Sequence, residues 1–236
     1  MENDLITVRH SAERGSANLG WLASKHTFSF ASYYDPNHMG FGDLRVINED
    51  RVEPGQGFGT HPHRDMEIIS YVIEGALAHQ DSMGNGTVIR SGDVQRMTAG
   101  TGVMHSEFNH SHDDQVYFLQ IWIEPDQQSL KPGYEQKSYR AKDKTNQLCL
   151  IASQTGRDTS LTIHQDLDLY ASVLTPGSEI SHEFATGRRG WLQIVRGTVA
   201  LNGEHLNQGD GAAIAETPTV SLRADENSEL LLFDMA

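Results

Sequence analysis

Basic residues are scarce in this chain of 236 residues, which has 18 Lys and Arg against 32 Asp and Glu and a formal net charge of −14. Binding to a nucleic-acid backbone depends on Lys and Arg, which release counterions from the phosphates. An acidic chain without a basic stripe is therefore not expected to bind nucleic acid. We interpret its charge as a feature that favours solubility.

Cysteine and long hydrophobic runs are also nearly absent. The single Cys149 cannot form an internal disulfide, and the apolar run 148–151 around it predicts a packed core thiol rather than a nucleophile. The longest apolar stretch near either end covers only residues 230–233, and the chain starts Met-Glu-Asn-Asp. We therefore expect no membrane-spanning helix, no secretory signal and a location in the reducing cytoplasm.

Period-two alternation of apolar residues is abundant, whereas no helical periodicity extends beyond about two turns. Val116 and Phe118 would face one side of a strand, and Tyr117 and Leu119 the other. The pairs Asn85-Gly86 and Asn202-Gly203 are expected to supply the positive φ of tight hairpins. We predict an all-β sandwich or barrel fold. The expected strands cover residues 44–47, 66–73, 116–123, 148–152, 167–174, 191–195 and 229–233.

The two halves of the chain repeat one order of motifs: a strand that ends in Gly, an Asn-Gly pair and a Gly-Asp turn. In the first half the motifs occupy residues 71–75, 85–86 and 91–93, and in the second half 193–197, 202–203 and 208–210. Glycine-rich β proteins also produce such echoes by chance, so the motifs alone leave duplication open. The polar stretch 125–144, which contains Pro132-Gly133, is predicted to connect the halves.

Two short segments carry the best candidate ligands among the 12 histidines: His61-Pro62-His63 and His105-Ser106-Glu107. Residues i and i+2 of a β-strand point to the same face, so each segment can direct two side chains at one point. Three imidazoles and one carboxylate suit a first-row divalent metal, and such a site keeps positions open for substrate or dioxygen. The absence of cysteine ligands argues against a closed thiolate zinc site.

The other histidines form no second pair of this kind, and we expect them to be ordinary core or surface residues. His110 and His112 alternate as well, but their Asn, Ser and Asp neighbours predict a solvated loop. The residues in question are His10, His26, His38, His79, His110, His112, His164, His182 and His205.

The sequence resembles the pirin family of the cupin superfamily, in particular the bacterial pirin-like quercetin 2,3-dioxygenases. The resemblance is carried by HTFSFASYYDPNHMGFGDLRVIN (26–48), GQGFGTHPHRDMEIISYVIEG (55–75), HQDSMGN (79–85) and GDVQRMTAGTGVMHSEFN (92–109). The second half is similar more loosely, through WLQIVRG, NGEHLNQGDG and ELLLFD.

The resemblance implies a bicupin of two β-barrel domains in tandem, with a metal in the first only. We expect a metal-binding domain at residues 1–130 and a degenerate cupin domain at 131–236. The family's ligands fall on His61, His63, His105 and Glu107. In the wider cupin pattern the carboxylate ligand often follows the His pair, where Glu67 stands, and we rank Glu107 above it.

In the second half only His182 stands where a first metal motif would lie, with Phe184 two residues on. Val220 is roughly where a second-motif histidine would be. The second domain is therefore expected to lack a metal site.

The implied reaction opens the central ring of a flavonol such as quercetin with O2, releases CO and leaves a phenolic ester. Glu107 is the expected base for the flavonol hydroxyl. Fe(II) is the favoured metal, and Ni, Cu, Co, Mn or Zn would also suit these ligands. Phe28, Phe30, Tyr33, Met39 and Phe41 could line the pocket, although an ordinary core role is favoured for them.

Two other functions fit the same residues. Eukaryotic pirins are regarded as metal-bound, redox-sensitive partners of transcription regulators, so a non-catalytic protein that binds a regulatory partner is the alternative. In a third option the metal only stabilises the first barrel. The expected partners of the enzyme are a small phenolic substrate and O2, without nucleic acid or membrane, and a monomer is compatible with this.

Overall fold

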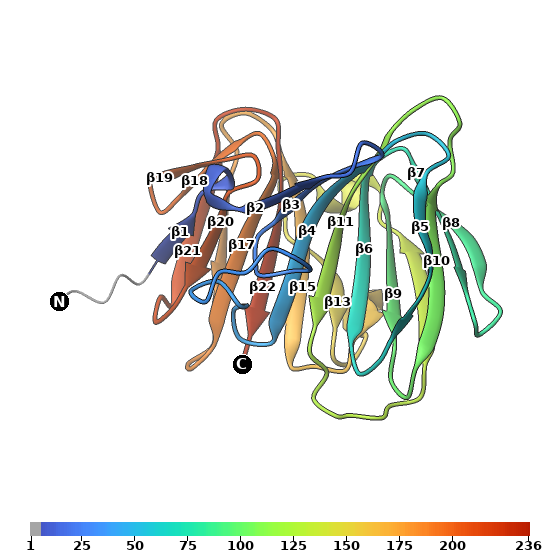
Figure 1. The fold of residues 1–236 in the computed structure, drawn as a ribbon. Helices are drawn as coiled ribbons and strands as arrows, with labels where there is room; N and C mark the ends of the chain where they lie inside the picture. Colours follow the sequence, from blue (N-terminus) through green and yellow to red (C-terminus); the bar gives the residue numbers. More distant parts are fainter. Residues whose placement is uncertain (1–5) are drawn as a thin grey trace. The chain divides into compact units, whose positions relative to one another are not determined.

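The computed structural model describes residues 6–236, which fold into two compact units (Figure 1). The first unit, here called the first barrel, comprises Gly15–Tyr139 and Leu161–Gln165. The second barrel comprises Arg140–Ser160, Asp166–Ala236 and the N-terminal segment up to Arg14. Each barrel is built from a larger and a smaller antiparallel sheet.

The sheets of the first barrel hold the predicted metal ligands. The smaller sheet has the order β5 (Gly57–His63), β10 (Val103–Asn109), β7 (Ala76–Asp81), β8 (Gly86–Arg90). The larger sheet has the order β12 (Gly133–Ser138), β9 (Asp93–Thr98), β6 (Glu67–Glu74), β11 (Val116–Ile123), β4 (Leu44–Val52), β3 (Leu22–His26), β2 (Gly15–Asn18).

The sheets of the second barrel follow the same order, strand for strand. The smaller one runs β16 (Glu179–Glu183), β21 (Thr219–Ala224), β18 (Thr198–Leu201), β19 (Glu204–Asn207). The larger one runs β1 (Ile6–Arg9), β20 (Gly211–Ile214), β17 (Arg189–Arg196), β22 (Ser228–Met235), β15 (Leu167–Leu174), β13 (Cys149–Ser153), β14 (Leu161–Thr162). This shared topology supports the interpretation of the sequence repeats as a structural duplication.

The remaining elements are short. They are the 3-10 helices Ser11–Glu13 and Arg157–Thr159 and the helix α1 (Ala141–Lys144). The prediction of an all-β fold is confirmed, and every predicted strand overlaps an observed one. No helix within residues 6–236 is long and apolar enough to cross a membrane. The N-terminal residues in which we looked for a signal, Met-Glu-Asn-Asp, lie outside the described residues.

Two local expectations are corrected by the structure. Asn202 and Gly203 do adopt positive φ, but in the other hairpin the positive φ falls on Gly84 rather than on Asn85-Gly86. The reason is that Asp81 Oδ1 accepts hydrogen bonds from the backbone N–H groups of Met83 and Asn85, which closes the turn one residue earlier. Cys149 is half-buried in β13 rather than packed in the core.

The predicted connector 125–144 contains the strand β12, which pairs with β9 from Gly133↔Thr98 to Ser138↔Asp93. In the second barrel β1 takes the equivalent edge position and pairs with β20. The contacts of the chain therefore group residues 131–139 with the first barrel and residues 6–14 with the second. The division into a metal-binding domain at 1–130 and a degenerate cupin domain at 131–236 stays a prediction.

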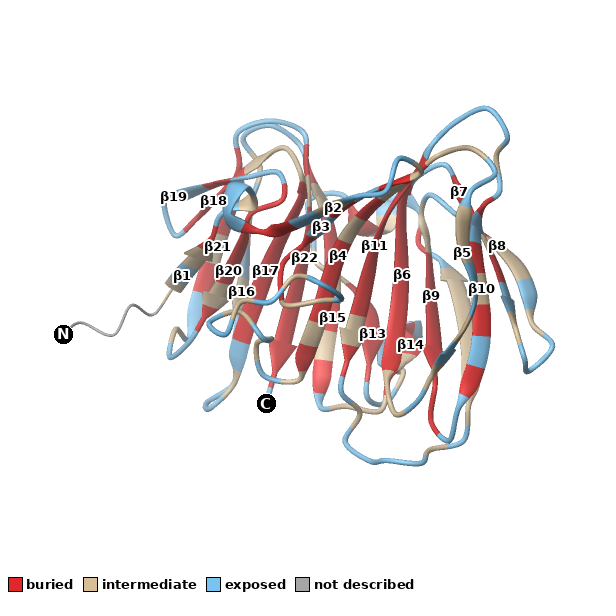
Figure 2. Ribbon diagram, viewed as in Figure 1, coloured by how far each residue is buried: buried red, intermediate tan, exposed pale blue. Residues whose placement is uncertain are grey.

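The interior of the first barrel consists of two apolar clusters with polar side chains between them. Along β6, Ile68 and Val72 belong to different clusters, and the buried Ser70 lies between them in sequence and on the same face. Figure 2 shows the long buried stretches of β6, β9 and β11. Directly paired residues of neighbouring strands form a buried polar row, which consists of His26, Asn48, Gln120, Ser70 and Gln95.

Candidate metal centre

The predicted ligands lie on two neighbouring strands of the smaller sheet in the first barrel. Strands β5 and β10 are antiparallel, and His105 stands directly opposite His61. The strands approach closely because Gly57 has no side chain: a Cβ at this position would lie 2.2 Å from the carbonyl oxygen of Glu107. The register shifts by a β-bulge between His105 and Glu107, a feature that redirects side chains.

The side chains of His61, His63 and His105 converge on one point. Their ligand atoms lie within 4.8 Å of one another, and Nε2 of His61 is 3.0 Å from Nε2 of His105. Two nitrogen ligands about 2.1 Å from one ion and at a right angle to each other are about 3.0 Å apart. The three imidazoles therefore fit a single metal ion.

The electrostatics of the cluster favour neutral imidazoles, the form that binds metals. Burial, assisted by the neighbouring His61, lowers the pKa of His63 to about 4. Burial and the charges of His63, His61 and His79 lower the pKa of His105 to about 2. Nδ1 of His61 donates to the carbonyl oxygen of Gly59 over 2.7 Å, which leaves the Nε2 lone pair free for a ligand.

Glu107 is buried beside the histidines, with 1% of its surface exposed. Its carboxyl group contacts the Ser70 hydroxyl at 3.1 Å and accepts a hydrogen bond from Gln120 Nε2 at 2.6 Å, while Ser70 also donates to Gln120 Oε1 at 2.9 Å. Burial raises the pKa of Glu107 to about 7, and nearby Asp50 contributes to this rise. A protonated Glu107 closes the ring of hydrogen bonds, because the single Ser70 hydrogen can then go to Gln120.

The structure places Glu107 in a second ligand cluster, with His105 and His79, whose ligand atoms also lie within 4.8 Å of one another. His105 thus belongs to both clusters and links the three-histidine group to the carboxylate.

Glu67, the other carboxylate considered from the sequence, is held by different partners. It is fully buried, lies 3.9 Å from Arg96 and accepts a hydrogen bond from Thr98 at 3.1 Å. His164 contacts it at 3.3 Å. Glu67 is in neither ligand cluster of the described residues, so the geometry favours Glu107 over Glu67.

Two cavities adjoin the histidines, and His63 lines both. The inner cavity, of about 80 Å³, is lined by polar side chains including Asp50, Glu107 and Gln120, and by Phe30, Phe58 and Trp122. The outer cavity, of about 430 Å³, is lined by residues of β5, β10 and their adjoining loops, including Pro62, Arg64, Ser82, Val103 and Met104. Only the outer cavity is within the range of about 300–1,000 Å³ that is typical of small-molecule sites.

Several residues of this site were not predicted from the sequence. His79, expected in the core or at the surface, lies next to His105 with a ring separation of 5.3 Å. His79 and Asp81 stand at i and i+2 on one strand, as His105 and Glu107 do. The same spacing that identified the ligand pairs could therefore have identified His79 and Asp81 as well. Of the predicted aromatic wall, Phe30 lines the inner cavity and packs on Trp122, whereas Phe28 is buried core.

The corresponding place in the second barrel holds no such cluster. His182 on β16 stands directly opposite Val220 on β21, in the smaller sheet that corresponds to that of β5 and β10. His182 Nε2 is 2.8 Å from Asp234 Oδ2, and Asp234 also pairs with Arg188. The ligand clusters found within residues 6–236 both lie in the first barrel.

Comparisons with known proteins agree with this arrangement. A family model described as Pirin matches residues 7–123, and one described as Quercetinase C-terminal cupin domain matches residues 150–235. The quercetin 2,3-dioxygenase of Escherichia coli (strain K12) is 49% identical over 231 residues, which cover 98% of this chain and 99% of that protein. A pirin-like protein of Caulobacter vibrioides is 42% identical over 223 residues, 94% of this chain and 96% of that protein.

Among solved structures, the bacterial pirin YhhW from Escherichia coli in complex with nickel(II) matches with a TM-score of 0.93 and 49% identity, covering 98% of each chain. Fold and site thus define a two-domain cupin protein with a candidate histidine metal centre in its first domain. This chain belongs to the pirin family.

Proposed function

We propose that this protein is a metal-dependent dioxygenase that opens the central ring of a flavonol such as quercetin. The observation that carries the proposal is the convergence of His61, His63 and His105 beside the buried carboxyl group of Glu107. Its similarity to proteins named quercetin 2,3-dioxygenase extends over 98% of the chain and supports the same activity.

The ligands that we propose are the three histidines and Glu107. Nickel is supported by the similar YhhW structure, which is a complex with nickel(II), and Fe(II) is our preferred ion because it suits dioxygen chemistry. When bound, such a cation stabilises a phenolate and favours the ionised form of Glu107. The chain's part is to present three neutral imidazoles and to exclude water from the carboxyl group.

The two cavities differ in volume and therefore suit ligands of different size. The outer cavity of about 430 Å³ is large enough for a flavonol, but Pro62 and Met104, which line it, alternate with the ligand histidines and so lie on the other face of β5 and β10. The inner cavity of about 80 Å³ is too small for a flavonol and suits O2 or water. His63 is the ligand that lines both cavities.

Glu107 is proposed as the base that takes the proton of the flavonol 3-hydroxyl group. Ser70 and Gln120 hold its two carboxyl oxygens, so the group has a fixed orientation. In the overall reaction one O2 is consumed, both of its atoms enter the phenolic ester, and one ring carbon leaves as CO. The proton taken by Glu107 returns to the product, so no other oxidant or reductant is needed.

The test is aerobic turnover of quercetin by the metal-loaded protein, followed by loss of flavonol absorbance and release of CO. Glu107→Gln should lower turnover by about 10²–10⁴-fold, the usual contribution of a general base. Glu204→Gln, which changes an exposed glutamate of the second barrel, is the matched control and should turn over like wild type. Equal rates for Glu107→Gln would refute its role as base, and wild type without turnover for any of the candidate metals would refute the function.

The cytoplasmic location and the monomeric state stay predictions. The single cysteine and the acidic composition support a reducing compartment.

A further inference from the structure

His105 lacks the hydrogen-bond partner that a metal-binding histidine needs. Its Nε2 faces His61, so a ligand that binds through this atom carries its proton on Nδ1 and donates it to an acceptor. The corresponding Nδ1 of His61 donates to Gly59. Nδ1 of His105 is buried without a partner among residues 6–236.

His79 offers the missing acceptor. It lies on β7 opposite Glu107 of β10, and its ring is 5.3 Å from that of His105 at an angle of 56°. Both histidines are 2% exposed. Nδ1 of His79 is also buried without a partner in the described part of the chain. No hydrogen bond joins the two nitrogens in this structure, but they are chemically complementary if one carries a proton and the other does not.

Asp81 determines which nitrogen of His79 carries the proton. Asp81 Oδ2 lies 3.2 Å from His79 Nε2, and an ionised carboxylate only accepts hydrogen bonds. The proton of His79 is therefore on Nε2, and its Nδ1 is an acceptor. Asp81 is itself fixed by the backbone N–H groups of Met83 at 2.9 Å and Asn85 at 3.0 Å, and by the Asn85 side chain at 2.8 Å.

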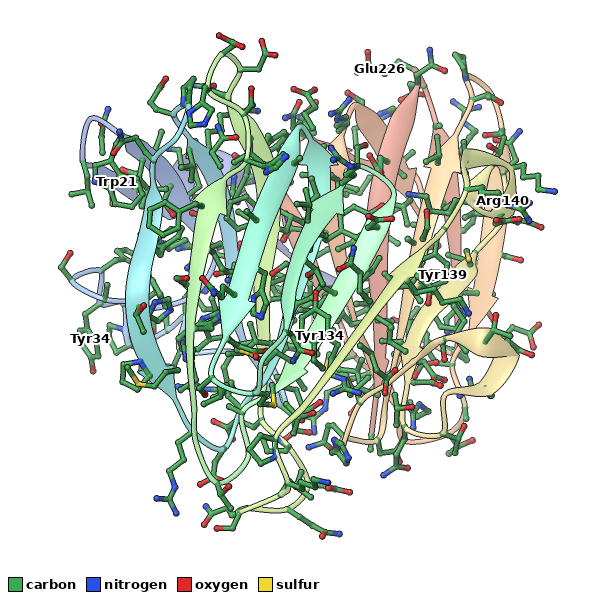
Figure 3. The ribbon with its side chains drawn as sticks, turned by 90° about the vertical axis from the view of Figure 1, so that its right-hand side faces the viewer. Trp21, Tyr34, Tyr134, Tyr139, Arg140 and Glu226 are labelled. Atoms are coloured by element: carbon green, nitrogen blue, oxygen red, sulfur yellow. The ribbon has the colours of Figure 1, made fainter. Side chains whose placement is uncertain are left out.

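We propose that His79, oriented by Asp81, is a positioning residue that accepts the Nδ1 proton of His105 and so directs the Nε2 lone pair of His105 toward the metal. The inference rests on the metal centre of the proposed function. The competing explanation is that His79 is only a packed aromatic residue, because its ring lies 5.0 Å from the ring of Tyr134 on β12. Figure 3 labels Tyr134 among the side chains of this region of the molecule.

The test uses the full chain loaded with Zn²⁺, a diamagnetic probe, and measures both Zn²⁺ affinity by chelator competition and the ¹⁵N shifts of the histidine rings. In wild type we expect the proton of His79 on Nε2 and that of His105 on Nδ1. Asp81→Asn keeps an oxygen for the turn but presents an NH₂ group to His79. The proton of His79 should then move to Nδ1, and Zn²⁺ affinity should fall about 10–100-fold, the usual effect of losing such an outer partner.

Two substitutions of His79 separate positioning from packing. His79→Leu should weaken Zn²⁺ binding as much as Asp81→Asn does, whereas His79→Asn, whose oxygen can stand near the place of Nδ1, should restore most of the affinity. His205→Leu, a change at an exposed histidine of the second barrel, is the control. Gln95→Leu is a second control, because the Gln95 amide is also buried in the first barrel without a partner among residues 6–236.

The proposal is overturned if wild-type His79 carries its proton on Nδ1, if His79→Leu and Asp81→Asn bind Zn²⁺ like wild type, or if Gln95→Leu alone weakens binding. These results are independent of turnover. A wild type that binds Zn²⁺ with the expected tautomers but turns over no flavonol with any metal contradicts the proposed function and leaves the positioning role intact.

Discussion

The third and fourth strands of the two larger sheets differ in one layer of side chains. In the first barrel the inward residues of β6 read Ile68, Ser70 and Val72, and those of β11 include Phe118 and Gln120. In the second barrel the corresponding strands β17 and β22 contribute aliphatic residues to a single cluster, including Leu192, Ile194, Leu230 and Leu232, and the buried Asp234 follows on the same face of β22.

This difference shows how one topology is used for chemistry and for packing. Burying polar groups costs free energy unless they are hydrogen-bonded, and the first barrel meets this cost by joining Ser70, Gln120 and Glu107 in one ring. The second barrel holds its buried Asp234 in an ion pair with Arg188 instead. The same strand order thus yields a reactive layer in one case and a continuous apolar core in the other.

Substitution of a metal ligand should have the largest effect on the difference between the two barrels. His105→Ala should weaken metal binding by roughly a hundredfold or more, since it removes a ligand rather than an outer partner. His182→Ala, a change at the second-barrel counterpart of His61, should leave the metal content after dialysis unchanged. Metal retained by His105→Ala, or lost from His182→Ala, would contradict the assignment of the centre to the first barrel.

A pair of Asp→Asn substitutions should change stability in opposite directions. Burial raises the pKa of Asp50 from 3.8 to about 7, so the folded state binds this proton more tightly than the unfolded chain does. The resulting stabilisation is complete below pH 3.8 and is lost as the pH rises through about 7. Asp50→Asn should therefore raise the free energy of unfolding of the metal-free protein at pH 8 by up to about 4 kcal/mol, and change it little near pH 4.

Urea unfolding at both pH values measures this effect, with the exposed Asp113→Asn as control. An equal difference from wild type at both pH values would show that Asp50 does not titrate as expected.

In the second barrel, Asp234→Asn should instead lower the free energy of unfolding by about 1–3 kcal/mol at pH 8. The substitution removes the negative charge that faces Arg188 and His182. Zn²⁺ affinity, measured in parallel, should not change. A stabilised Asp234→Asn, or one with altered Zn²⁺ binding, would mean that the barrels do not differ as described.

The smallest effect is expected from Ser70→Ala. The hydrogen bond from Ser70 lowers the pKa of Glu107, so its loss should raise that pKa further and move the acid limb of kcat/KM to higher pH. Turnover should fall at pH 6 and stay close to wild type at pH 9. Ser172→Ala, which changes a buried serine of the second barrel, is the matched control, and a profile of Ser70→Ala that coincides with it would remove Ser70 from the network.

The sequence predicted the strands and the two ligand pairs because both depend on a period of two, which is local. Residues 116–123 and 167–174 were predicted with the observed bounds. The neighbourhood of His79 and His105 could not be predicted in the same way, since it depends on β7 lying beside β10. The edge position of β12 could not be predicted either, because its residues are polar and half-buried, like those of a connector.

The edge strands of the two barrels, β12 in the first and β1 in the second, have a consequence for synthesis of the chain. Ile6 pairs with Ile214, which lies far later in the chain, so this edge of the second barrel can form only after residue 214 has been made. The larger sheet of the first barrel has all its strands as soon as residues 133–138 emerge. Because pairings distant in sequence form slowly, we expect the metal-binding half to fold first and the second half to limit the rate of folding.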